Sequence, residues 1–302
     1  MTMIDFAGRT AFVTGGANGI GIGLVRALLA EGCKVAIADI RQDAIDTALK
    51  TLDNQMVMGV QVDVASRDGM ERAADAVEAA FGPVSLLFNN AGINLFQSIE
   101  DSSYSDWDWV MGVNLHGPIN GVMTFVPRMI NAGNGGYIVN TASMAGWLAA
   151  GSPGIYNTTK FAVRGMSESL RYSLAPHGIG VSILCPGLVK SYIYASDDVR
   201  PKDLLAGAKP VDTENVKRLA EFHEFGMEPD VIAARVLDGM RENRAYIFSH
   251  PEFREELAEL FDEYMADFRD YPNDPGFEKR IGFEAFRRDR YKEARAAARK
   301  AV

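Results

Sequence analysis

The stretch that decides the fold is TAFVTGGANGIG, residues 10–21. Residues 10–14 form a short apolar run typical of a buried strand, and a helical pattern follows over 19–31. A glycine-rich turn between a strand and a helix lets backbone N–H groups approach a pyrophosphate, and the helix N-terminus adds a favourable field. Such a turn is weak evidence alone, so its meaning depends on the rest of the chain.

Apolar runs and helical patterns alternate along the chain after this turn. Strands are expected at 10–14, 34–39, 57–62, 85–88, 136–141, 180–184 and 245–248, and helices at 19–31, 42–52, 67–81, 105–132, 153–175 and 229–242. Unbroken strands of this kind, joined by helices, predict a parallel sheet covered on both faces. Right-handed crossovers make such a sheet doubly wound. We therefore expect an α/β fold with a single Rossmann-like sheet of about seven strands.

Two regions depart from this rhythm. Residues 188–227 are polar and irregular, with one expected helix at 213–225, and an insert beyond a strand's carboxyl end is where a lid is expected. Residues 251–302 form a charged helical extension with helices at 252–268 and 277–300, expected to pack on the domain formed by 1–250. Three roles stay open for the extension: capping a pocket, locking a subunit interface, or presenting an ordinary solvated surface.

Composition excludes several classes of protein. The chain has 302 residues, of which 47% are hydrophobic, and this is ample for one full core. Its net charge of −9 argues against nucleic acid or an anionic membrane as a partner. Residues 1–9 lack a signal-peptide pattern and no run is long enough to span a membrane, so a cytoplasmic protein is expected. Cys33, Cys185 and the scattered histidines show no ligand spacing, so we expect no metal site.

An acidic residue, Asp39, ends the second expected strand. A carboxylate at this point can accept hydrogen bonds from both hydroxyls of an adenosine ribose and would repel a 2′-phosphate, which favours NAD over NADP. Two alternatives remain: Asp39 is a simple turn acid, or Arg41, two residues later, recruits the phosphate.

Tyr156 and Lys160 lie one helical turn apart, which places the phenol and the ammonium on one face. A cation beside a phenol favours the phenolate and lowers its pKa from about 10. Such a residue can take or give a proton at an alcohol or a carbonyl. Ser143, just after the strand at 136–141, fits the same chemistry, although it could be only a helix-cap serine. Taken alone, the pair is weak evidence, because tyrosine and lysine are common on exposed helix faces.

With these motifs in this order, the chain resembles the short-chain dehydrogenase/reductase family over residues 5 to about 250. The resemblance implies an NAD(P)-dependent oxidoreductase that interconverts a secondary alcohol and a ketone by hydride transfer. It implies Tyr156 as the acid/base and Lys160 as the residue that lowers its pKa and binds the nicotinamide ribose. Ser143 would hold the substrate oxygen. Asn114 would hold a water in a proton relay, unless it is a buried amide that satisfies helix carbonyls.

The resemblance also implies a cofactor site and an assembly. The cofactor residues follow the carboxyl ends of the strands or belong to the catalytic helix: Gly15, Asn18, Gly19, Ile20, Gly21, Asp39, Arg41, Asp63, Val64, Asn90, Ala91, Gly92, Tyr156, Lys160, Pro186, Gly187, Val189 and Ser191. Ser191 stands where the family usually has threonine. Asn90 is expected to position backbone and not to perform chemistry. A homodimer or homotetramer is implied, built through the helices near 105–132 and 153–175.

A narrower resemblance bears on the substrate. Residues 124–130 (TFVPRMI), 178–182 (GIGVS), 190–193 (KSYI) and 251–254 (PEFR) are similar to the Cα-dehydrogenases of lignin β-aryl-ether breakdown, which oxidise a benzylic alcohol with NAD. Apolar residues after the cofactor and catalytic motifs are candidates for the substrate pocket: Leu95, Phe96, Trp147, Leu148, Tyr192, Ile193 and Tyr194. They could instead pack a lid or a subunit contact. Other hydrophobic or polyol alcohols, or a non-catalytic dinucleotide-binding scaffold, remain alternatives.

Overall fold

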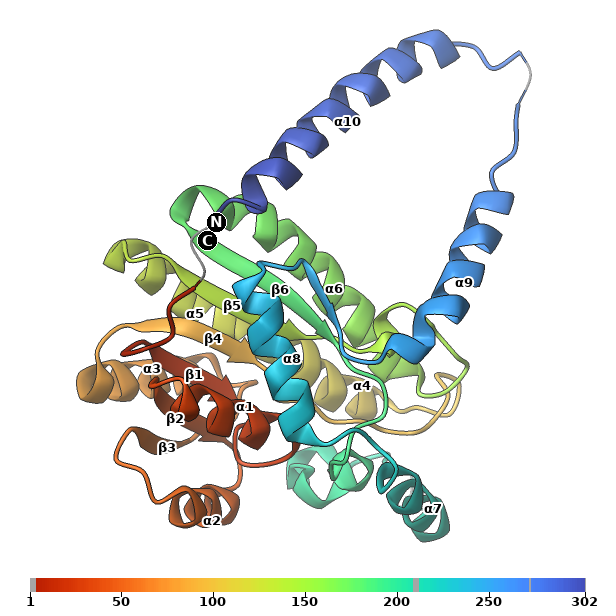
Figure 1. Ribbon diagram of the computed structural model, residues 1–302. Helices are drawn as coiled ribbons and strands as arrows, with labels where there is room; N and C mark the ends of the chain where they lie inside the picture. Colours follow the sequence, from red (N-terminus) through yellow and green to blue (C-terminus); the bar gives the residue numbers. More distant parts are fainter. Residues whose placement is uncertain (1–3, 209–211, 272, 302) are drawn as a thin grey trace.

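A parallel β-sheet forms the centre of the protein (Figure 1). The computed structural model describes residues 4–208, 212–271 and 273–301. Over these residues the sheet has seven strands in the order β3-β2-β1-β4-β5-β6-β7, all pairs parallel. The strands are β1 (Thr10–Thr14), β2 (Lys34–Asp39), β3 (Val57–Gln61), β4 (Val84–Asn89), β5 (Gly136–Thr141), β6 (Ile179–Cys185) and β7 (Tyr246–Phe248). The expected α/β class and strand number are confirmed.

Helices cover both faces of this sheet (Figure 1). The α-helices of the described residues are α1 (Gly19–Ala30), α2 (Gln42–Leu52), α3 (Arg67–Phe81), α4 (Tyr104–Met111), α5 (Gly117–Ala132), α6 (Gly154–Leu174), α7 (Thr213–His223), α8 (Pro229–Arg241), α9 (Arg254–Ala266) and α10 (Phe277–Ala298). One core packs α1, α2 and α8 against the sheet, and a second packs α3, α5 and α6 against the opposite face. The doubly wound arrangement is therefore confirmed. None of the described helices is long and apolar enough to cross a membrane.

The central strands are apolar on both faces because helices cover both faces and exclude water. Ala11, Phe12 and Val13 of β1 have no exposed surface, and Val13 pairs with Ile37 on one side and Phe88 on the other. Each large apolar side chain buried in this way contributes about 1.5–3 kcal/mol. This burial explains why the strands read as continuous apolar runs without alternation.

The expected helix at 105–132 is interrupted in the structure. A π-helical turn, η1 (Gly112–His116), separates α4 from α5. Ser103 caps α4 reciprocally with Asp106, which fixes where the helix begins. Turns of this wider type occur often at functional sites. Here the turn carries Asn114, which has no exposed surface.

The expected lid, 188–227, contains the short 3₁₀ helices η4 (Ile193–Val199) and η5 (Lys202–Leu204) and the helix α7. Its residues 209–211 lie outside the described part. Arg200 forms an ion pair with Asp106 of α4 at 2.7 Å, and both side chains are only 2% exposed. The described part of the lid is therefore held against α4 by a buried charge pair.

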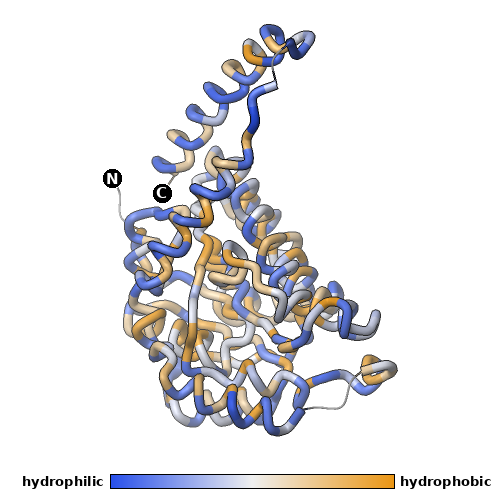
Figure 2. The backbone as a smooth tube through the Cα atoms, turned by 90° about the vertical axis from the view of Figure 1, so that its right-hand side faces the viewer, coloured by the Kyte–Doolittle hydropathy of each residue, from blue (hydrophilic) through white to orange (hydrophobic). Residues whose placement is uncertain are grey.

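The C-terminal extension leaves the body as a bent arm of α9 and α10 (Figure 1). It contacts the body at its start, where Phe261 packs against Trp147 at 6.0 Å, and at its end, where Asn243 Nδ2 donates to the carbonyl of Ala298 at 2.9 Å. Between these contacts several large apolar side chains are exposed, and Figure 2 shows apolar residues scattered along an otherwise hydrophilic arm. The division into residues 1–250 and 251–302 remains a prediction.

Candidate active site

A cleft of about 700 Å³ opens at the carboxyl ends of the strands. It lies over β1 and β4, the neighbouring strands from which the chain leaves in opposite directions. Open α/β sheets bind their ligands at this switch point. Loops after β1, β2, β3, β4, β5 and β6 contribute to its wall, together with α6, part of the lid and the start of α9.

The glycine turn after β1 depends on close backbone packing. Gly15 has φ of +61°, and a Cβ there would lie 2.9 Å from Cα of Ala91. A Cβ on Gly21 would lie 1.9 Å from the carbonyl oxygen of Gly15. Any other residue at position 21 would therefore push the first turn of α1 away from the glycine turn. Asn18, Gly19 and Ile20 line the cleft, whereas Gly21 lies behind it. The turn is thus shaped so that a diphosphate could approach the N-terminus of α1.

Asp39 is held at the end of β2 by this turn. Its two carboxylate oxygens accept hydrogen bonds from the backbone N–H groups of Ala17 and Arg41, at 3.2 and 3.1 Å. Arg41 also lines the cleft, but its guanidinium is paired with Asp43 at 2.6 Å. The carboxylate is therefore the fixed charge at this end of the cleft, and the nearby cation is held in an exposed ion pair.

The segment after β4 joins three strands through hydrogen bonds. Asn90 receives a bond from the hydroxyl of Thr141 at 3.5 Å and donates from Nδ2 to the carbonyl of Thr14 at 3.1 Å. These bonds hold the backbone after β4 against the ends of β1 and β5. Ala91 and Gly92 line the cleft, and so does Val64 after β3. Asp63 does not: its carboxylate accepts the N–H of Ala65 at 2.9 Å and lies outside the cleft wall.

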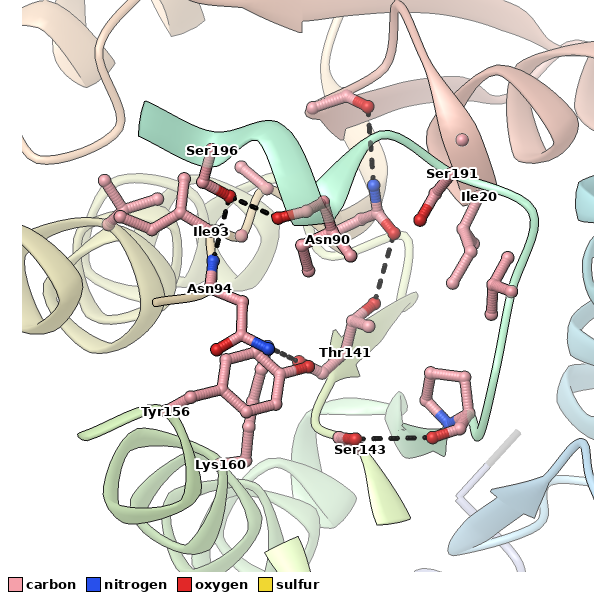
Figure 3. Close-up of a pocket in the computed structure, with 18 of the residues that line it drawn as sticks. Ile20, Asn90, Ile93, Asn94, Thr141, Ser143, Tyr156, Lys160, Ser191 and Ser196 are labelled. Carbon is pink, nitrogen blue, oxygen red and sulfur yellow. Dashed lines mark hydrogen bonds between the residues drawn. The ribbon is translucent and has the colours of Figure 1, made fainter. Parts of the chain in front are cut away.

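Ser143, Tyr156 and Lys160 come together at the middle of the cleft (Figure 3). Lys160 Nζ lies 5.3 Å from the centroid of the Tyr156 ring and donates to the carbonyl of Thr141 at 2.9 Å. The Ser143 hydroxyl donates to the carbonyl of Pro186 at 3.3 Å and is also hydrogen-bonded to the Tyr156 phenol. The helix spacing and the strand end therefore bring all three groups to one point.

Burial dominates the ionisation of these groups. It raises the pKa of Tyr156, and the hydrogen bond with Ser143 opposes this rise. Burial also lowers the pKa of Lys160 to about 8. Desolvation is thus the largest influence on the pKa of the phenol, and the lowering of that pKa by Lys160 stays a prediction.

Asn114 links the π turn to the loop after β4. Its Oδ1 accepts the N–H of Ile93 and its Nδ2 donates to the carbonyl of Ile93, both at 2.8 Å. A Cβ on Gly92 would lie 3.5 Å from Asn114 Oδ1 and 3.6 Å from Lys160 Nζ, so these residues meet at one side of the cleft. The side chain of Asn114 thus fixes the loop that follows Gly92.

The turn after β6 has a partner that the sequence did not reveal. His250 Nδ1 accepts the N–H of Gly187, and its Nε2 donates to the carbonyl of Leu188, both at 2.9 Å. His250 lies in the segment after β7. The only sequence signal for it is that it directly precedes residues 251–254, which are similar to the Cα-dehydrogenases. Further along the chain, Val189 and Ser191 line the cleft.

Six of the seven expected substrate residues divide into two groups, and Tyr194 does not line the cleft but packs its ring 5.1 Å from that of His223. Phe96, Leu148, Tyr192 and Ile193 line the cleft. Leu95 and Trp147 pack in apolar clusters behind it, and the indole N–H of Trp147 bonds the sulfur of Cys185 at 3.4 Å. Several lining residues were not singled out from the sequence: Asn94, Met144, Asn157, Phe253 and Glu256.

This sheet, with its glycine turn and clustered serine, tyrosine and lysine, is that of a nucleotide-dependent oxidoreductase. Residues 9–200 match the model of the short chain dehydrogenase family, and the chain belongs to this family. The family binds a nicotinamide dinucleotide, and the turn at Gly15 and the carboxylate of Asp39 suit that group.

Three relatives extend the comparison. The C alpha-dehydrogenase of Sphingobium sp. strain SYK-6 is 37% identical over 293 residues, which cover 95% of this chain and 96% of that protein. A solved short-chain dehydrogenase from Novosphingobium aromaticivorans is 61% identical with a TM-score of 0.86, covering 97% of this chain and 99% of that one. A short chain dehydrogenase/reductase from Burkholderia phymatum, solved in complex with NAD, is 34% identical with a TM-score of 0.84, covering 90% and 99%. The resemblance to the Cα-dehydrogenase branch is thus confirmed.

Proposed function

We propose that this oxidoreductase interconverts a secondary aromatic alcohol and its ketone, with NAD as cofactor. The main observation behind the proposal is that Ser143, Tyr156 and Lys160 lie together in one cleft. Asp39 lines the same cleft at the end of β2. The similarity to a C alpha-dehydrogenase along nearly the whole chain supports the aromatic substrate.

In the oxidation, the phenolate of Tyr156 takes the proton of the alcohol oxygen while that oxygen forms a double bond to its carbon. The hydride, with its electron pair, leaves that carbon, and the nicotinamide ring supplies the acceptor when it is bound. Ser143 holds the same oxygen by a hydrogen bond, which is strongest as charge develops there. While it is protonated, Lys160 supplies positive charge that favours the phenolate. Reduction reverses each step, and Tyr156 returns the proton.

The preference for NAD rests on the fixed charges at the end of β2. The Asp39 carboxylate suits two ribose hydroxyls and repels a 2′-phosphate. Arg41, which could bind that phosphate, is paired with Asp43 at 2.6 Å. Both observations favour NAD.

The substrate end of the cleft favours a bulky, apolar alcohol. Phe96, Leu148 and Ile193 supply apolar surface near Tyr156, and Trp109 and Phe253 extend the wall. A polyol would leave many hydroxyl groups unpaired against such a wall. An aryl carbinol fits this chemistry better than a sugar alcohol does.

The proposal includes a homodimer or homotetramer in the cytoplasm, built through the helices α5 and α6. Met123 on α5 and Phe161 on α6 are exposed apolar side chains on these helices, as expected of a subunit contact. The free thiols Cys33 and Cys185 are buried and suit a reducing compartment. Light scattering coupled to size-exclusion chromatography would measure the number of subunits, and a monomer would contradict the assembly.

The decisive experiment is a screen that follows NADH absorbance with benzylic, aliphatic and polyol alcohols, in wild type and in Tyr156→Phe. We expect aryl carbinols to give the highest kcat/KM and the variant to lose turnover while keeping its affinity for NAD. A better aliphatic or polyol substrate would contradict the aromatic assignment. Binding of NAD without turnover of any alcohol would indicate a non-catalytic scaffold.

A further inference from the structure

The arm formed by α9 and α10 has almost no buried surface. Within these two helices, residues 254–266 and 277–298, only Ala298 is buried. A helix in water derives most of its stability from packing an apolar face against a neighbour. Eight large apolar side chains of the arm are instead 49–78% exposed: Tyr264, Met265, Phe268, Tyr271, Phe277, Ile281, Phe283 and Phe286. An exposed apolar surface of this extent marks a site of interaction.

The apolar side chains of α9 form one continuous stripe. It consists of residues at helical spacing: Leu257, Leu260, Phe261 and Tyr264. The stripe begins on the body, where Leu257 packs against an apolar cluster and the ring of Phe261 lies 6.0 Å from that of Trp147. Further along, Tyr264 remains exposed, and so does Phe268 just after the helix. The body therefore covers only the first part of the stripe.

The chain cannot cover the exposed part itself, because the far end of the arm is fixed as well. Asn243 Nδ2 donates to the carbonyl of Ala298 at 2.9 Å, and the buried Arg171 holds Asn243 through a bond from Nη1 to Oδ1 at 3.0 Å. The ring of Tyr291 lies 6.2 Å from that of Tyr172 on α6. Between the two ends α9 and α10 stand apart from each other (Figure 1). Folding the arm onto the body would break one of these contacts, so the partner comes from outside the chain.

The two helices of the arm carry opposite charge. α9 has five acidic side chains and one basic one, whereas α10 has seven basic and four acidic ones. Three of the four acids on α10 form ion pairs within that helix, which leaves its surplus of positive charge for a partner. Because α9 and α10 of one chain stand apart, they cannot neutralise each other. The charge of α9 in one copy is complementary to that of α10 in another.

Charge also separates the kinds of partner. Nucleic acid and an anionic membrane surface would both repel the acidic α9 and a chain of net charge −9. A second copy of this chain supplies an acidic helix and a basic helix together. A two-fold axis brings α9 of each copy to α10 of the other at the same time, so one symmetric contact covers the apolar surface of both helices.

We propose that the arm is an interaction surface for a second copy of this chain, with α9 of each copy packed along α10 of the other. The contact is separate from the one proposed for α5 and α6, and it does not depend on which alcohol the protein oxidises. It also reaches the cleft. Phe253 and Glu256, where the arm begins, line the cleft wall, so binding of the second copy holds that part of the wall in place.

Charge reversal tests this contact, because only a second copy can repair it. The α9 variant carries Glu259→Lys, Asp262→Lys and Glu263→Lys. The α10 variant carries Lys279→Glu, Arg288→Glu and Arg295→Glu. Each variant alone brings like charges together wherever α9 meets α10 of the other copy. In a mixed assembly with one copy of each variant, both contacts again join opposite charges.

Amide hydrogen exchange measures the contact directly, because the backbone amides of an uncovered helix exchange quickly. In wild type we expect the amides of α9 and α10 to exchange about tenfold or more slower than in either variant. Co-expression of the two variants with different tags, followed by purification through both tags, gives the mixed assembly, whose arms should regain wild-type protection. Reversal of three exposed acids in the lid is the matched control and should leave exchange in the arm unchanged: Glu214→Lys, Glu221→Lys and Glu224→Lys.

Three results would overturn the proposal. Exchange in the wild-type arm as fast as in the variants would show that nothing covers the arm. Protection that survives both reversals would show that the arm packs on its own body. Protection that is lost in both variants and not regained in the mixed assembly would show that α9 and α10 do not pair between copies. All three are measured without substrate, so a failure of the proposed reaction leaves the test intact.

Discussion

His250 Nδ1 accepts a hydrogen bond from the backbone N–H of Gly187 at 2.9 Å, across 63 positions of sequence. The same ring fixes the carbonyl of Leu188 through Nε2. A Cβ on Gly187 would lie 2.5 Å from the Phe253 ring and 3.0 Å from the His250 ring, so the turn packs directly against the first residues of the extension. This contact makes the shape of the turn after β6 depend on residues that lie beyond β7.

Replacing His250 should therefore affect cofactor binding. His250→Leu leaves the Gly187 N–H without its acceptor, and we expect KM for NAD to rise about tenfold or more, from a cost of about 1–3 kcal/mol. His250→Asn offers an acceptor in place of Nδ1 and should recover part of the loss. Steady-state kinetics at saturating alcohol would measure both. If the two variants lower only the unfolding temperature, His250 is purely structural.

Ser143→Ala should slow the reaction and move its pH profile. Loss of one hydrogen bond to the developing oxyanion costs about 10²–10³ in kcat. Oxidation needs the Tyr156 phenolate, so its rate rises with pH. Because the hydrogen bond with Ser143 lowers the pKa of Tyr156, its removal should move the rising limb to higher pH. Reduction needs the phenol, so its falling limb should move the same way. A shift to lower pH would contradict this role.

The cofactor preference should change when two carboxylates are altered together. Asp39→Ser removes the ribose acceptor and the repulsion of a 2′-phosphate, and Asp43→Asn frees Arg41 from its 2.6 Å ion pair. We expect the ratio of kcat/KM for NADP over NAD to rise by about tenfold or more in the double variant. Asp46→Asn, another acid on α2, is the control and should leave the ratio unchanged. An unchanged ratio in the double variant would refute the ribose assignment of Asp39.

The ion pair between Arg200 and Asp106 should stabilise the lid much more than an exposed pair does. Arg200→Met leaves the Asp106 carboxylate buried without its counter-charge, which costs about 3–5 kcal/mol. KM for the alcohol should rise as well, since Arg200 also lies 4.9 Å from the ring of Trp109 in the cleft wall. Lys217→Met, which removes an exposed pair with Glu214 in the same segment, should cost less than about 1 kcal/mol. Chemical denaturation would compare the two, and equal losses would argue against the buried pair.

The sequence predicted the architecture well because its signals are local. Apolar runs such as residues 10–14 define a strand without knowledge of the rest of the chain, and the alternation of runs and helices then defines the sheet. The positions of Ser143, Tyr156 and Lys160 could be inferred for the same reason, since strand ends and one helical turn place them. Local pattern thus sufficed wherever the geometry is set within one element.

The parts that the sequence did not predict depend on contacts across long distances in the chain. Both Trp147 and Leu148 follow Ser143 and look equally suited to a pocket, but Trp147 turns away because Arg164 lies 3.6 Å from its ring and Tyr246 packs at its edge. The unpaired side-chain oxygens of Asn89 and Asn94 could not be inferred either, since only the folded structure shows which amide atoms have partners. The pKa of Tyr156 could not be predicted from the sequence either, because desolvation of the phenol depends on the packing of the whole cleft.

Lys160 should make the free energy of unfolding depend on pH. Burial lowers the pKa of its ammonium from 10.5 to about 8 in the folded protein. Below pH 8 both states carry the charge, and its burial costs about 3 kcal/mol. Between pH 8 and 10.5 the folded state loses the proton first, so the unfolded state binds more protons and the contribution of this residue to stability rises with pH. Lys160→Met removes the titrating group and should flatten that rise. Urea denaturation of wild type and variant without cofactor, across this range, would measure the difference. Parallel curves for the two proteins would show that Lys160 does not carry the cost of a buried charge.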